Sequence, residues 1–381
     1  MKKAISALVF LLLAVFIISC SSVGDLSADP QFKDRRGFDK DLSDAEGEYQ
    51  SAKQFMEAEN YYDAVVHLRK AVKLDPDYAE AWAMLGDGLA KVKKHEEAIE
   101  AFKNALELNP EDESLIASLG YNYLSSNNLD KAEEYYNMLI EKDFYDYNGN
   151  VYLAFIAKQR NQIDSAITHY KRALKTKPGD AVTLGSIASL YGDKGDKDKE
   201  IEYMQKAVEV DSTNYTMLQK LAGAYFSAQK YEKAVPVYNA LLEVYPDNAS
   251  FHQRLGFSIS QAGGNYKEAT AELEKANLLS GGNPFNYALL AKIYNDNKKY
   301  DEAVAAARMG LKIGGGKEAF LRYQLGEALS KKVMYEEAIT QFQKVVSLGV
   351  KPWSNSAKEQ IERQEMLIKR LEAQKEQEKY E

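Results

Sequence analysis

The sequence predicts an all-α protein, a solenoid of about nine helix-turn-helix repeats with a capping helix at its C-terminal end. Three observations predict this fold. Small residues return every 34 or 35 positions, apolar residues follow helical spacing within each interval, and Pro76, Pro110, Pro178 and Pro246 are separated by 34 or 68 residues. Hydrophobic residues make up 45% of the 381 residues and charged residues 28%, which is the composition of a chain that folds.

The N-terminal residues predict a secretion signal. Lys2 and Lys3 precede a mostly apolar run, residues 4–18. This run is shorter than the ~20 residues that span a bilayer and is typical of a signal peptide. A plain secretory signal and an uncleaved anchor both fit this pattern.

The only cysteine, Cys20, directly follows this segment. Its position resembles a bacterial lipobox. The resemblance implies a lipoprotein signal peptide over residues 1–19, lipidation of Cys20 and attachment to a membrane through the N-terminal lipid. Because Ser21 is not aspartate, the resemblance also implies the outer membrane, on the side that faces the periplasm. The alternative is a secretory signal with an incidental cysteine.

Residues 20–44 are mostly polar and charged, and we expect them to form a flexible tether after the lipidated cysteine. Their few apolar residues include Phe32 and Phe38. The alternative is that one of these two rings docks on the first repeat.

Alanines set the register of the repeats, which we expect over residues 45–352 as one continuous superhelix. Six register steps of 34 residues and two of 35 define nine units, and Glu200 stands at the one position without alanine. The repeated alanines are Ala64, Ala98, Ala132, Ala166, Ala234, Ala269, Ala303 and Ala338.

The second repeat, residues 79–112, has the clearest pattern. Its first helix carries an apolar stripe at i, i+3, i+4 and i+7, and its second helix carries a stripe of small and aromatic residues. These are Trp82, Leu85, Gly86 and Leu89, followed by Ala98, Phe102, Ala105 and the terminating Pro110. The pattern resembles the tetratricopeptide repeat (TPR). The resemblance implies a right-handed α-solenoid in which the first helices line a concave groove.

The fifth repeat departs from this pattern. It contains Gly185, Gly192 and Gly195, with Glu200 at the alanine position and Met204 at the aromatic position. Glycine within a helix costs about 1 kcal/mol relative to alanine. We therefore expect residues 181–200 to be the softest part of the array.

Residues 353–381 follow the last repeat. Apolar residues on a background of Lys, Glu and Gln predict a capping helix over residues 354–372, followed by a polar tail. A coiled-coil dimer is the alternative, but the segment has only about two of the three or four heptads that such a dimer needs.

Nothing in the sequence predicts catalysis, so we expect no catalytic residues, no metal site, no cofactor and no enzyme activity. A single cysteine excludes an intramolecular disulfide, and the four histidines form no zinc motif. Lys317 follows three glycines, but Leu311 and Glu318 stand where a P-loop needs Gly and Ser or Thr. The net charge of −8 also disfavours nucleic acid as a partner.

The TPR resemblance implies that the concave groove binds a protein or peptide. Charges at the positions implied to face inward, among them Asp87 and Lys91, are nearly balanced. We predict that the partner-binding aromatics are Tyr121, Phe155, Phe226 and Phe257, all on one inner wall. The expected function is that of a membrane-anchored scaffold or adaptor that binds a protein or peptide segment in the cell envelope. Assembly of an envelope machine is one such role. A glycan-handling protein is the alternative function, and packing between neighbouring first helices is the alternative role for the aromatics.

Overall fold

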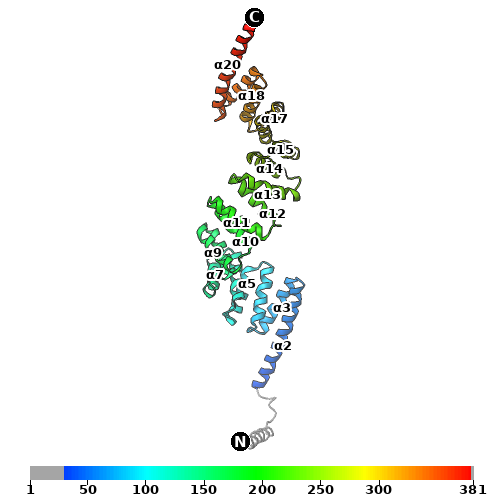
Figure 1. Cartoon of the computed structure of the whole chain (residues 1–381). Coiled ribbons are helices and arrows are strands. Elements are labelled where there is room, and N and C mark those ends of the chain that lie inside the picture. Colours follow the sequence, from blue (N-terminus) through cyan, green and yellow to red (C-terminus); the bar gives the residue numbers. More distant parts are fainter. Residues whose placement is uncertain (1–29, 379–381) are drawn as a thin grey trace, which may run out of the picture. The chain divides into compact units, whose positions relative to one another are not determined.

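The computed structural model describes residues 30–378, and this range is all helical, with 19 helices and no strand (Figure 1). The predicted all-α fold is therefore confirmed. Within the described range the first 18 helices form nine consecutive hairpins, and a final helix follows. The helices of each hairpin pack against each other, and each hairpin packs against the next one within its part of the chain.

The first helices of the hairpins are α2 (Pro30–Glu57), α4 (Ala79–Lys91), α6 (Glu113–Ser125), α8 (Tyr147–Gln159), α10 (Ala181–Asp193), α12 (Tyr215–Ser227), α14 (Ala249–Gln261), α16 (Pro284–Asp296) and α18 (Glu318–Lys331). The second helices are α3 (Tyr61–Leu74), α5 (His95–Leu108), α7 (Leu129–Lys142), α9 (Ile163–Thr176), α11 (Lys197–Val210), α13 (Tyr231–Val244), α15 (Tyr266–Ser280), α17 (Tyr300–Ile313) and α19 (Tyr335–Leu348). The last helix is α20 (Trp353–Glu378).

The chain divides into two compact units, which differs from the single continuous superhelix that the repeat pattern predicts. Unit 1 ends at Lys177 and contains α2–α9, and unit 2 begins at Pro178 and contains α10–α20. Each unit has its own buried core. A repeat protein buries its core only between neighbouring repeats, so an array can divide at a repeat boundary without leaving either part unpacked. We describe each unit by itself.

Close approach between the two helices of a hairpin explains the small residues. All eight repeated alanines are 0% exposed. A side chain at Gly86 would place its Cβ 2.7 Å from the Phe102 ring, and one at Gly120 would lie 2.8 Å from the Tyr136 ring. The aromatic residue of the second helix therefore fills the space that the small residue of the first helix leaves.

The turn between the helices of a hairpin needs a left-handed residue. Its φ is positive in all nine described hairpins, with glycine at only two of these positions, Gly195 and Gly263. In the other seven described hairpins the turn residues are Glu59, Lys93, Asn127, Asn161, Gln229, Lys298 and Val333. Gly195 therefore occupies a position that suits glycine, and its presence is not a weakness of the fifth repeat.

The predicted tether over residues 20–44 differs from the structure, because residues 30–44 form the first part of α2. The later turns of α2 pack on α3, with Ala45 and Ala52 fully buried. Once a helix is nucleated by such packing, each further residue adds one backbone hydrogen bond, and polar and charged residues propagate it readily. The predicted capping helix is present as α20, which packs on α19 and continues to Glu378, beyond the expected residue 372.

Candidate functional site

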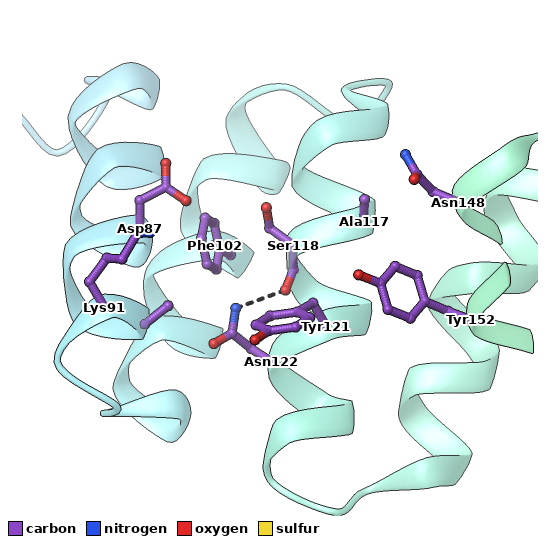
Figure 2. Close-up of a pocket in the computed structure, with 10 residues that line it drawn as sticks. Asp87, Lys91, Phe102, Ala117, Ser118, Tyr121, Asn122, Asn148 and Tyr152 are labelled. Carbon is purple, nitrogen blue, oxygen red and sulfur yellow. Dashed lines mark hydrogen bonds between the residues drawn. The ribbon is translucent and has the colours of Figure 1, made fainter. Parts of the chain in front are cut away.

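A hollow in unit 1 is the candidate site. Its volume is about 430 Å³, and it is lined by the first helices of three successive repeats, α4, α6 and α8, with Phe102 of α5 also in its lining (Figure 2). The lining residues are Asp87, Ala90, Lys91, Phe102, Ala117, Ser118, Tyr121, Asn122, Asn148 and Tyr152. Spacing by whole repeats brings these residues together although they span 66 positions of the chain, from 87 to 152.

The charged side of the hollow comes from α4. Asp87 and Lys91 are one helical turn apart, at i and i+4, so both side chains lie on the same face. Asp87 is open to solvent on one side, yet the surrounding protein excludes water from the rest of its carboxyl. This burial raises the pKa of Asp87, and the positive charge of Lys91 offsets part of the rise. The Lys91 Nζ also lies 5.9 Å from the centroid of the Tyr61 ring.

The aromatic side of the hollow comes from α6 and α8. Tyr121 is 49% exposed, and its ring meets the Tyr152 ring edge to face, with 6.4 Å between centroids. Figure 2 shows Tyr152 extending from α8 towards α6 with its hydroxyl on the side of Tyr121. Tyr152 stacks in turn on the fully buried Tyr136, with centroids 4.7 Å apart and planes at 13°. Burial raises the pKa of both Tyr152 and Tyr136, so these two phenols stay neutral at physiological pH.

Asn122 supports the hollow from within α6. It is 1% exposed, and its Nδ2 donates to the Ser118 carbonyl at 2.8 Å (Figure 2). Its Oδ1 lies 3.0 Å from His95 Nδ1. These bonds satisfy both ends of the buried amide, which holds His95 and α6 in place. His95 therefore has a structural role in this arrangement.

The four predicted groove aromatics have different environments in the two units. In unit 1, Tyr121 lines the hollow, and Phe155, which is 38% exposed, lies one turn after Tyr152 on α8 but outside the lining. In unit 2, Phe226 and Phe257 are half-buried and pack against the core. Their ring centroids are 5.3 Å apart, and both contact Tyr231, at 5.7 and 5.5 Å. The remaining predicted site residue, Cys20, lies outside the described residues.

Sequence reasoning missed two of the polar and aromatic residues that shape the hollow, Tyr152 and Ser118. Both stand at the sixth position of a repeat, which is not among the positions that the TPR resemblance assigns to the groove. The sequence shows that these two residues are 34 positions apart. It does not show that Tyr152 of α8 faces the small residues Ala117 and Ser118 of α6 in the hollow.

Unit 2 contains a second hollow of about 380 Å³ at the equivalent place in the repeat pattern, between α10 and α12 with α11 behind. Its lining has no aromatic ring. The lining residues are Ser189, Gly192, Asp193, Lys197, Glu200, Met204, Lys220, Gly223, Ala224 and Ser227. The same arrangement of helices therefore presents aromatic rings in one hollow and mainly small and charged residues in the other.

No cluster of three or more His, Cys, Asp or Glu side chains in residues 30–378 is placed to hold a metal ion. None of the described helices combines the length and the apolar character needed to cross a membrane.

Stacked helical hairpins with small residues at the helix contacts and hollows between first helices define a helical-repeat scaffold for protein interactions. The repeats over residues 49–248 are tetratricopeptide repeats. The model of the TPR domain of cytochrome c-type biogenesis protein H matches residues 49–183, and two further tetratricopeptide repeat models match residues 181–214 and 217–248.

Solved TPR structures resemble parts of the chain. PilW, described as a widely conserved type IV pilus biogenesis factor, is 18% identical, with a TM-score of 0.45, over 56% of this chain and 98% of PilW. PilF of Pseudomonas aeruginosa is 16% identical, with a TM-score of 0.45, over 56% of this chain and 96% of PilF. YrrB, described as a TPR protein with an unusual peptide-binding site, is 20% identical, with a TM-score of 0.41, over 48% of this chain and 96% of YrrB. No curated protein sequence matches this chain.

Proposed function

We propose that this protein is a lipid-anchored TPR scaffold of the cell envelope that binds a protein or peptide segment in the hollow of unit 1. The observation that carries the proposal is the exposed Tyr121 ring in that hollow, with a charged pair on the opposite side. An exposed aromatic beside polar groups is typical of a contact surface for a partner.

The chemistry of the hollow defines the kind of segment that fits. Tyr121 and Tyr152 offer ring surface to an apolar side chain, and Tyr136 behind them keeps Tyr152 in place. Asp87 and Lys91 offer one acceptor and one cation to the backbone or to a polar side chain of the partner. We therefore expect the bound segment to place an apolar side chain next to a polar or charged one.

Crosslinking in cells tests this site. Tyr121 is replaced by a photoreactive phenylalanine analogue, and the same analogue is placed at Tyr62 of α3, which is 72% exposed and outside the hollow, as a matched control. A single polypeptide that crosslinks at position 121 and not at position 62 is the expected result. Equal products at both positions would contradict a specific site.

Substitution separates binding from packing. Tyr121→Ala should weaken partner binding about tenfold while the melting temperature barely changes, because the ring is half exposed. Phe155→Ala should behave similarly, whereas Phe257→Ala should lower the melting temperature, because its ring packs with Phe226 and Tyr231. A large loss of stability in Tyr121→Ala would assign that ring to the core instead.

The membrane anchor and the outer-membrane location rest on the position of Cys20 after the apolar run. In the Cys20→Ala variant, label from a fatty-acid analogue should be lost and the protein should leave the membrane fraction with its helical content unchanged. Label that persists in this variant would rule out Cys20 as the lipidation site.

Glycan handling is the second candidate, favoured by the edge-to-face pair Tyr121 and Tyr152, because aromatic rings also stack on sugar rings. The crosslinking experiment distinguishes the two candidates. Product that is sensitive to muramidase or another glycosidase and resistant to protease would favour peptidoglycan or an exported polysaccharide over a polypeptide.

A further inference from the structure

A basic and aromatic surface lies at the last repeat of unit 1, outside the hollow. Two exposed rings come from the turn between α7 and α8, and four cations come from α9 and the residue after it. We call this surface the α9 patch, and it consists of Phe144, Tyr145, Lys171, Arg172, Lys175 and Lys177.

Direct contacts join the turn to the helix. The Arg172 guanidinium carbon lies 4.2 Å from the centroid of the Phe144 ring, and Thr176 Oγ1 donates a hydrogen bond of 2.5 Å to the Tyr145 carbonyl. Lys177 Nζ lies 3.8 Å from the centroid of the Tyr147 ring. The turn and the helix therefore form one surface, on which Phe144 is 50% exposed and Tyr145 is 45% exposed.

The charge of the α9 patch is positive in an acidic protein. No acidic residue occurs in residues 165–179, although the chain as a whole has a net charge of −8. The turn contributes Asp143 and Asp146, and each accepts a backbone hydrogen bond, from Tyr145 N at 2.9 Å and from Gly149 N at 2.5 Å. Within the described residues, Arg172 and Lys175 form no ion pair with a carboxylate.

The repeat pattern does not require this surface. Arg69, Lys70 and Lys73 of α3 stand three repeats earlier at the positions of Lys171, Arg172 and Lys175. On α3, however, Arg69 pairs with Glu97, and Lys70 pairs with Glu48 at 3.3 Å. The positions equivalent to Phe144 and Tyr145 are Leu42 and Ser43. Arg172 and Lys175, which form no ion pair within the described residues, lie on the same surface as two exposed rings, and this distinguishes α9 from α3.

We propose that the α9 patch docks unit 1 on a membrane surface that contains anionic phospholipids. Aromatic rings on a protruding turn prefer the interface between water and lipid, and cations next to them are attracted to anionic headgroups. The acidic remainder of the protein is repelled by the same headgroups, so this patch fixes which side of unit 1 faces the lipid. The docking is independent of Cys20 and of the partner in the hollow.

Vesicle binding tests the proposal with the full chain, prepared without lipidation through Cys20→Ala. Sedimentation is measured with vesicles of phosphatidylcholine alone and of an equimolar mixture with phosphatidylglycerol. The patch variant is Lys171→Gln with Arg172→Gln and Lys175→Gln. The matched control, Arg69→Gln with Lys70→Gln and Lys73→Gln, has the same change of net charge. All proteins carry the same N-terminal residues, so their contribution is common to every measurement.

We expect tighter binding to the mixed vesicles, a loss of about 100-fold in the patch variant and little loss in the α3 control, at about 1 kcal/mol per cation. Phe144→Ser with Tyr145→Ser should reduce binding about tenfold without changing the preference for phosphatidylglycerol. Thermal unfolding confirms that each variant is folded.

Three results would overturn the proposal. Equal binding to both kinds of vesicle would exclude recognition of anionic headgroups, and equal losses in the patch variant and the α3 control would assign binding to net charge. Retention of soluble polyglutamate by the patch, together with an absence of vesicle binding, would assign the surface to an acidic protein segment.

Discussion

The second and fifth repeats are the same kind of helical hairpin, but different side chains fill the contact between their two helices. In the second repeat, α4 and α5 meet through Gly86 and Ala98 and close on the large ring of Phe102. In the fifth repeat, Met204 takes the position of Phe102, and Glu200 takes the position of the buried alanine. Gly192, at the position of Ala90, leaves the space that Glu200 enters, because a Cβ at residue 192 would lie 2.9 Å from the Glu200 carboxyl carbon.

Two of the three glycines in the fifth repeat have a structural role. Gly192 makes room for Glu200, whose carboxylate binds Lys197 Nζ at 3.0 Å, and Gly195 occupies the left-handed turn position with φ of 78°. Gly185 has neither role, since its φ is not positive and the nearest atom to a Cβ there is Met217 Cε at 3.7 Å. Gly192 therefore compensates for the larger side chain at residue 200. That residues 181–200 open first in hydrogen exchange stays a prediction.

The largest loss of stability should follow truncation of the buried residues that line the two hollows, Phe102 and Met204. Phe102→Ala should reduce the free energy of unfolding by about 3–5 kcal/mol, and Met204→Ala by about 2–5 kcal/mol, because both side chains are almost fully buried. Chemical denaturation, followed separately for the two units by hydrogen exchange, measures both values. A smaller loss in Phe102→Ala than in Met204→Ala would contradict the idea that the ring fills the second repeat more completely.

Substitutions at the left-handed turn residue should change stability in opposite directions in the two repeats. Gly195→Lys should destabilise the protein by about 1–2 kcal/mol, because a side chain is strained at positive φ, and Lys93→Gly should remove a similar strain from the second repeat. Part of the Lys93→Gly gain is offset by the greater freedom of glycine in the unfolded chain. Thermal unfolding of both variants is the measurement. Stabilisation in Gly195→Lys would show that the turn relaxes freely.

Alanine substitutions at the two helical glycines of the fifth repeat, Gly185 and Gly192, should have different effects on stability. Gly185→Ala should stabilise the fifth repeat by about 0.5–1 kcal/mol, because alanine favours the helix and its Cβ meets only an ordinary contact. Gly192→Ala is the matched control, and its gain in helix propensity should be cancelled or reversed by the crowding with Glu200. Equal stabilisation by the two substitutions would mean that Glu200 moves aside without cost.

The smallest expected effect is the pH dependence of stability that comes from Asp87 in the hollow of unit 1. The pKa of Asp87 is raised in the folded protein above its ordinary value of 3.8, so the folded state holds this proton more tightly than the unfolded state. The associated stabilisation is complete below pH 3.8 and is lost as the pH rises through the folded pKa. Asp87→Asn should remove this part of the pH dependence, and a difference in stability that is constant with pH would contradict the shift.

Short-range sequence information determined the frame of this protein. The positions of the hairpins, the eight fully buried alanines and the contact of Gly86 with Phe102 all follow from residues that lie within one 34-residue unit. Helix spacing and the size of two side chains are sufficient to predict such contacts, because both partners are fixed by the same hairpin. The same information places Asp87 and Lys91 on one face of α4.

The surfaces were decided only by the tertiary structure. Tyr121 and Phe226 both satisfy the pattern of a groove aromatic, yet Tyr121 stays half exposed against Tyr152, whereas Phe226 packs with Phe257 and Tyr231. Each outcome depends on residues that the next repeat or the following helix supplies, and a repeat pattern does not specify those neighbours. The start of α2 at Pro30 has a related cause, because packing of its later turns on α3 stabilises helix in a segment whose composition alone predicts a tether.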